Sequence, residues 1–137
     1  MGSQSTLNTV PRMAAVATGG STPTAVPSAT LQFVAMNNDG TSAGGAAFSG
    51  DLVRALRILV AWQNLSGTHS ERLELFSPDG SLYQQFSTQF AGTPVETRLS
   101  VTGTWITQYS LFGAWRVDVF LDSETMPITS GVFLLNP

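Results

Sequence analysis

The sequence predicts an all-β domain, a sandwich of antiparallel sheets, preceded by an extended N-terminal arm. Apolar and polar residues alternate with a period of two over several short segments, which is the pattern of half-buried strands. Turn sequences rich in Gly, Asn, Asp and Pro separate these segments at intervals of roughly 8–15 residues. Residues 1–29 lack this alternation and contain many Gly, Pro, Ser and Thr residues, so we expect an arm or linker before a domain at 30–137.

The first predicted strand covers residues 31–36, where apolar residues alternate from Leu31 onward. The sequence Asn-Asn-Asp-Gly at 37–40 then predicts a turn, because Asn and Asp tolerate turn conformations and Gly accepts a positive φ. A Gly-rich loop over 41–47 leads into a short strand near Phe48. The chain therefore begins its domain with a strand, a turn and a second, shorter strand.

The segment 52–64 carries the clearest strand pattern in the chain. Apolar residues recur at every second position from Leu56 to Trp62. A helix that starts at Asp51 as its N-cap is the competing interpretation for 51–57. The β-branched and aromatic residues from Ile58 onward favour a strand.

Five more strands are predicted in the second half of the chain. The turn Ser77-Pro78-Asp79-Gly80 separates the first two, because Pro fixes φ at its second position and Gly accepts a positive φ. The total of about seven or eight strands is typical of a sandwich or barrel. These five strands are predicted at residues 71–76, 82–88, 95–101, 115–121 and 128–135.

Four features of the predicted domain occur together in a known family. Trp62 closes an apolar strand, the turn Phe76–Gly80 follows, and the last two strands read Phe112–Asp122 and Gly131–Leu135. This combination resembles the immunoglobulin-like β-sandwich modules of bacterial surface and secreted proteins. The resemblance implies an immunoglobulin-like fold over 30–137 and a role as a spacer, adhesion unit or binding appendage. The chain has no cysteine pair flanking a tryptophan, which excludes the antibody-type subfamily.

Composition excludes several classes of function. Charged residues make up 11% of the chain, the formal net charge is −3, and all six cations are arginines without a basic cluster, so nucleic-acid binding is not expected. The chain has no cysteine, which excludes disulfides, thiolate nucleophiles and cysteine-ligated metals. No stretch approaches the ~20 apolar residues of a membrane span. We therefore expect no membrane span, no nucleic acid and no cofactor.

Residues able to support catalysis or hold a metal are few. His69 is the single histidine and lies in a polar segment predicted to be an exposed loop, and no G-x-S-x-G elbow accompanies it. One histidine without cysteine does not make a zinc site. The turn 37–40 is the nearest candidate for a calcium loop but lacks the D-x-[DN]-x-[DN]-G pattern, so a plain turn is expected.

Pairs of carboxylates, as in glycoside hydrolases, also lack the required spacing. Glu71 and Glu74 point to opposite faces of a strand, and Asp118 and Asp122 lie ~13 Å apart along one. We expect these acids to form a solvated face with Arg72 and Arg116 through cross-strand pairs. The sequence therefore predicts neither an enzyme nor a catalytic residue.

The aromatic residues divide into a core set and a candidate binding set. Trp62 and Trp115 fit the apolar phase of their strands and are expected in the core. Trp105, Tyr109 and Phe112 fall in the segment Gly103–Gly113, predicted to be a loop, and are the candidate binding patch. A protein partner, self-association or a carbohydrate ligand would each fit such a patch.

Two hypotheses from different classes follow for the function. The first is a non-catalytic binding or spacer module of a bacterial protein, located outside the cell or at the cell surface if a signal sequence was removed. The second is a self-assembling structural subunit, such as a phage decoration, capsid or fibre protein of the virion. In the second, residues 1–29 would add a strand to the open sheet edge of a neighbour.

Overall fold

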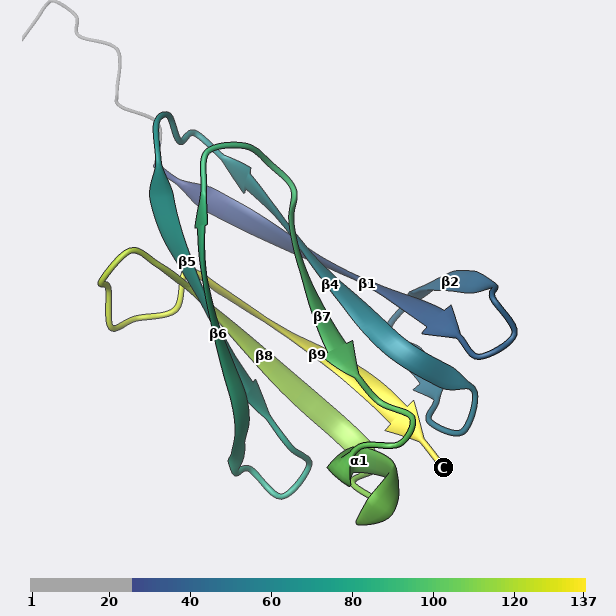
Figure 1. Cartoon of the computed structure of the whole chain (residues 1–137). Helices are drawn as coiled ribbons and strands as arrows, with labels where there is room; N and C mark the ends of the chain where they lie inside the picture. The colour runs from purple at the N-terminus through teal and green to yellow at the C-terminus, as the bar shows by residue number, and fades with distance from the viewer. Residues whose placement is uncertain (1–25) are drawn as a thin grey trace, which may run out of the picture.

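Alternating apolar side chains build two sheets that pack face to face (Figure 1). The computed structural model describes residues 26–137. The four-stranded sheet has the order β2-β1-β4-β7, with β2 at Ser42–Gly45, β1 at Ser28–Asn37, β4 at Val53–Gln63 and β7 at Val95–Ser100. The five-stranded sheet has the order β3-β9-β8-β5-β6, with β3 at Ala47–Ser49, β9 at Thr129–Asn136, β8 at Gly113–Leu121, β5 at His69–Phe76 and β6 at Leu82–Phe90.

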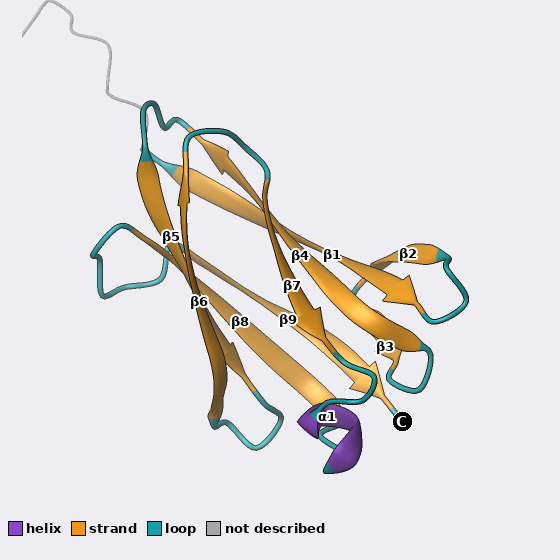
Figure 2. Cartoon of the chain, in the orientation of Figure 1, coloured by secondary structure: helices purple, strands orange, loops and turns teal. Residues whose placement is uncertain are grey.

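Strands and turns account for nearly all of the described chain, which confirms the predicted all-β sandwich (Figure 2). The single helix, α1 (Trp105–Gln108), is too short to cross a membrane, and no other helix occurs in residues 26–137. All sheet neighbours are antiparallel except β3 and β9, which run parallel and so depart from the expected pattern. Over residues 26–137 the structure has nine strands.

Two of the predicted segments differ in detail from the structure. The Gly-rich run at 41–47 was expected to be a loop, but β2 forms within it by pairing with Phe33–Met36 of β1. The favoured strand at 52–64 is confirmed as β4, and the competing helix at 51–57 does not form, since β4 begins at Val53. The first strand begins at Ser28, and the predicted arm lies almost entirely outside the described residues.

The core lies between the sheets and is built from the inward positions of both. Trp115 and Trp62 are buried there, as predicted. The indole of Trp115 stacks on Phe133 at a centroid separation of 6.1 Å and meets Tyr83 edge-on at 5.1 Å. Tyr83 lies at a β-bulge: it has no partner on β5, and the register of the β5–β6 pairing shifts at this point.

The loops gather at two opposite ends of the sandwich. One end carries α1, the β3–β4 and β5–β6 turns and the C-terminus, and the other carries Val26 and the β4–β5, β6–β7 and β8–β9 loops (Figure 1). These are called the helix end and the Val26 end below. Each end brings together residues that are far apart in the sequence.

Candidate functional site

The helix end presents two aromatic side chains on a firmly anchored turn. Thr104 caps α1, since its Oγ1 accepts from the backbone N–H of Ile106 and donates to the carbonyl of Val101 at 2.7 Å. Ile106 is fully buried and fixes the helix to the core. Its neighbours Trp105 and Tyr109 therefore point outward into solvent.

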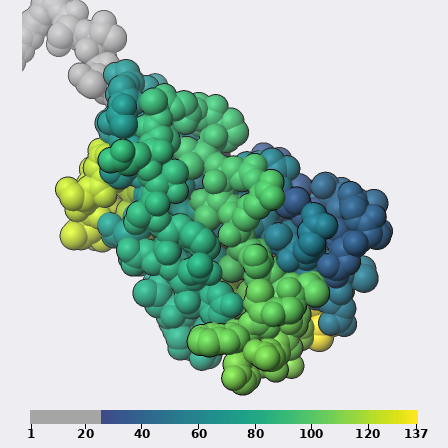
Figure 3. All heavy atoms as spheres, viewed as in Figure 1, coloured from purple at the N-terminus to yellow at the C-terminus, as the bar shows by residue number. Residues whose placement is uncertain are grey.

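Trp105 and Tyr109 are the aromatic side chains most exposed in the described chain, at 66% and 67%. Their rings meet edge-on, with centroids 6.3 Å apart and planes at 75°. Atoms of this segment project at the lower edge of the molecule in Figure 3. No charged residue occurs from Val101 to Trp115, so the polar side chains of this segment are neutral amides and hydroxyls. The pair forms an exposed, uncharged aromatic surface.

Phe112, the third predicted member of the patch, is partly buried and packs against the core, so it offers less surface than Trp105 and Tyr109. A Cβ built on Gly50 would overlap Phe112 Cε1. Ser110 has a φ of 52°, which turns the chain back so that Phe112 points inward. Phe112 thus packs against the core beside Gly50.

Two exposed leucines at the helix end were not predicted. Leu52, in the β3–β4 turn, is 61% exposed, and Leu82, at the start of β6, is 52% exposed. Leu52 also lines a shallow pocket with Asn37, Asn38 and Asp39. Leu52 lies in a turn and Leu82 is the first residue of a strand, so neither has a fixed face in a sequence pattern and no sequence signal placed them at the helix end.

The turn at 37–40 forms as predicted. Asp39 Oδ1 accepts hydrogen bonds from both the backbone N–H and the hydroxyl of Thr41, at 2.9 and 2.6 Å. These bonds hold the pKa of the Asp39 carboxyl below its usual value. Among residues 26–137, no three His, Asp or Glu side chains gather as they would around a metal ion.

The Val26 end contains a buried acid, Glu71, that the sequence analysis placed wrongly on a solvated face. Its side chain is 1% exposed, because Glu71 shares the inward phase of β5 with Leu73 and Leu75. This alternation with Leu73 and Leu75 was the sequence signal that could have predicted the burial of Glu71. Glu71 Oε1 accepts from the indole N–H of Trp62 at 2.7 Å, and its Oε2 has no hydrogen-bond partner. Burial raises the pKa of the carboxyl to about 7, although the Trp62 bond acts in the opposite direction.

His69 opens β5 and is partly buried, whereas an exposed loop position was predicted. Its Nδ1 lies 2.9 Å from Asp122 Oδ2 and its Nε2 lies 2.9 Å from the carbonyl of Ser66. Both partners are acceptors, so the ring satisfies both only when each nitrogen carries a proton. The bond to Asp122, and then that to Ser66, raises the pKa of His69. The histidine ties the β4–β5 loop to the end of β8.

The outer face of the five-stranded sheet brings two carboxylates together. Glu74 and Asp118 lie directly opposite each other on β5 and β8, a pairing that depends on strand register and has no sequence signal. Each binds an arginine of its own strand, Arg72 and Arg116, at 3.2 Å. These ion pairs run along the strands, which corrects the predicted cross-strand pairs. The guanidinium groups also stack at 4.1 Å over aromatic rings, Arg72 over Phe120 and Arg116 over Phe76.

Comparison with solved structures shows the same architecture in a bacterial protein. An immunoglobulin-like protein from Pseudomonas aeruginosa superimposes with a TM-score of 0.52 at 14% sequence identity, over 82% of this chain and 98% of that one. No protein-family model and no curated protein matches the sequence. The domain therefore has an immunoglobulin-like β-sandwich fold, as the sequence resemblance implied.

Proposed function

We propose that this domain is a non-catalytic binding module of a bacterial extracellular or cell-surface protein, and that it contacts its partner through Trp105 and Tyr109. The observation that carries the proposal is the exposure of both rings on a turn that Ile106 and Thr104 anchor. Exposed Trp and Tyr side chains dominate the binding energy of many interfaces. A turn held in place before binding also loses little conformational entropy when a partner docks.

The geometry of the pair favours a protein partner over a carbohydrate. Two coplanar rings would offer a flat platform to a sugar, but the planes of Trp105 and Tyr109 lie at 75°. Such an edge-to-face pair suits an apolar side chain that inserts beside one ring and covers the other. The absence of charged residues from Val101 to Trp115 favours a contact region without net charge on the partner.

Three of the candidates for chemistry, His69, Glu74 and Asp118, have structural partners, which supports a non-catalytic role. Both ring nitrogens of His69 are hydrogen-bonded. Glu74 and Asp118 are each paired with an arginine on an outer sheet face. Immunoglobulin-like domains commonly bind through end loops, where recognition residues sit on a rigid scaffold.

The first test is a binding screen with the full chain and a Trp105→Ala/Tyr109→Ala variant against peptide and glycan arrays. We expect peptide ligands of the wild type to lose about 2 kcal/mol of affinity or more in the variant, which is roughly thirtyfold. Val26→Ala/Met126→Ala is the matched control, since both residues are exposed and lie at the other end. Equal binding by the aromatic variant contradicts the proposal, and variant-sensitive binding to glycans alone replaces the protein partner with a carbohydrate.

Tryptophan fluorescence gives an independent measurement on any ligand found. Trp62 and Trp115 are buried, at 5% and 0% exposure, so acrylamide quenching reports chiefly on Trp105. We expect the ligand to protect this fluorescence from quenching. A ligand that binds without altering the quenching of Trp105 would place the contact elsewhere on the domain.

A further inference from the structure

Strand β6 leaves one long sheet edge unpartnered within residues 26–137. It forms the outer strand of the five-stranded sheet and bonds only to β5. Its nine residues include no charged residue, no proline and no glycine. Natural proteins usually protect such edges with charges, prolines or short strands, because free N–H and C=O groups pair readily with another strand.

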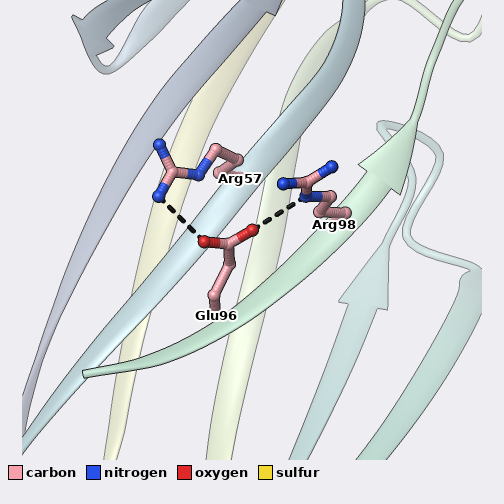
Figure 4. Close-up of polar contacts among 3 residues, drawn as sticks. All are labelled: Arg57, Glu96 and Arg98. Atoms are coloured by element: carbon pink, nitrogen blue, oxygen red, sulfur yellow. Dashed lines mark hydrogen bonds and ion pairs between the residues drawn. The ribbon is translucent and has the colours of Figure 1, made fainter. Parts of the chain in front are cut away.

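The other outer strands carry the protection that β6 lacks. Strand β7 has Glu96 and Arg98 on its exposed positions, and Glu96 bonds both Arg98 and Arg57 at 2.8 Å (Figure 4). Strands β2 and β3 have only four and three residues. On the side away from β6, the side chain of Leu31 in β1 packs against Gly131 of β9.

We propose that β6 is a homodimer interface, at which two copies of this chain pair β6 to β6 antiparallel and join their five-stranded sheets. A two-fold axis perpendicular to the sheets relates such copies, so each residue contributes to both halves of the contact. This axis keeps every side chain on its own face of the sheet, so two residues that lie directly opposite each other must point to the same face. Because faces alternate along a strand, the axis must pass beside one residue, which lies opposite its own copy. Phe86 is the middle residue of Leu82–Phe90, and centring there pairs the greatest length of strand.

The side chains of β6 complement themselves in this register. Gln85 and Ser87 of one copy lie opposite Ser87 and Gln85 of the other, and Gln84 likewise lies opposite Thr88. All four are exposed and neutral, so no like charges meet, and their amides and hydroxyls can bond across the axis. Gln84 and Thr88 pair with inward-facing residues of β5 and so lie on the inner face of the sheet. Both are nevertheless exposed, which leaves their side chains free to contact a second copy.

Light scattering behind size exclusion tests the proposal on the full chain. We expect the mass to rise with concentration from the 14.5 kDa of one chain to twice that value. Gln85→Lys/Ser87→Lys should hold the mass at one chain, because four lysines would meet at the axis. Ser123→Lys/Thr125→Lys adds the same charge in the exposed β8–β9 loop and should still dimerise. A wild-type monomer at millimolar concentration, or a dimer that survives the β6 lysines, overturns the proposal.

Disulfide trapping then distinguishes β6–β6 pairing from a contact of β6 with another segment. The chain contains no cysteine, so introduced thiols have no competitors. Gln85→Cys and Ser87→Cys variants, mixed and oxidised, should form a covalent heterodimer in much higher yield than a mixture of Ser123→Cys and Thr125→Cys. If the chain dimerises but the 85–87 mixture yields no more covalent dimer than the control mixture, the second copy binds at another surface.

Discussion

Glu71 shows how one residue sets the pH dependence of this fold. Its carboxyl is buried between the sheets, with one oxygen on the indole of Trp62 and the other unpartnered. Its pKa of about 7 exceeds the ordinary value of 4.5. Because the native state binds the proton more tightly than the unfolded chain, stability is highest below pH 4.5 for this group and falls as the pH rises towards 7. The loss amounts to ~3 kcal/mol.

Glu71→Gln should therefore stabilise the domain above pH 7 and leave it nearly unchanged at pH 4. The amide keeps an acceptor for Trp62 and removes the buried charge. Urea unfolding at pH 4 and pH 8 measures both free energies. Glu74→Gln, on the exposed side of the same strand, is the control and should not flatten the pH profile. A Glu71→Gln variant that is less stable than wild type at pH 8 would refute the assignment.

His69 adds a pH dependence of the same sign. Its pKa is raised through Asp122 and Ser66, so its stabilising contribution is complete below about 6.5 and disappears as the pH rises through the native pKa. Asp122 has the opposite dependence, since its own pKa is lowered by the N–H of Ser70 and by His69. The Glu71→Gln variant should retain the part of the pH dependence of stability that comes from His69 and Asp122.

At the scale of elements, the close approach of Gly50 to the α1–β8 connection fixes the helix end. Gly50 donates to the carbonyl of Asn136, and an added Cβ would overlap Phe112 Cε1 and lie 3.0 Å from that carbonyl. Gly50→Ala should therefore destabilise the domain by about 1–3 kcal/mol. Gly92→Ala is the control, because nothing lies within 4 Å of its added Cβ.

Thermal unfolding followed by circular dichroism compares these variants. A second substitution, Phe112→Leu, should recover part of the stability lost in Gly50→Ala by removing the ring that the new methyl meets. A Gly50→Ala domain as stable as the Gly92→Ala control would show that the connection can move aside at little cost.

The sequence predicts the long strands well, because their periodicity of two reflects burial of one face. It fails where neighbouring elements decide the structure. Strand β2 has the sequence Ser-Ala-Gly-Gly, without side chains to show a period, and forms through its partner β1. Helix α1 has four residues, about one turn, too few for a helical pattern. Trp105 and Tyr109 were identifiable as aromatics outside a strand phase, while Phe112 turns inward because of the backbone at Ser110.

At the scale of the whole molecule, the architecture places three features in different parts of the domain. The aromatic pair occupies the helix end, the ionisable cluster of Glu71 and His69 lies near the Val26 end, and β6 runs along one side between them (Figure 1). Pairing of two copies through β6 would leave both α1 helices uncovered. The assembled protein would then present two aromatic surfaces, and a partner with repeated sites would bind with higher avidity than either surface alone provides.

Dimerisation through β6 also predicts that thermal stability depends on protein concentration. A native state that associates gains stability by mass action, so the melting temperature should rise as the chain is concentrated. The Gln85→Lys/Ser87→Lys variant should melt at one temperature over the same range, because its native state is a monomer. Differential scanning calorimetry across a concentration series measures both proteins. Equal dependence in the two proteins would mean that association involves another surface, since the β6 lysines leave all other surfaces unchanged.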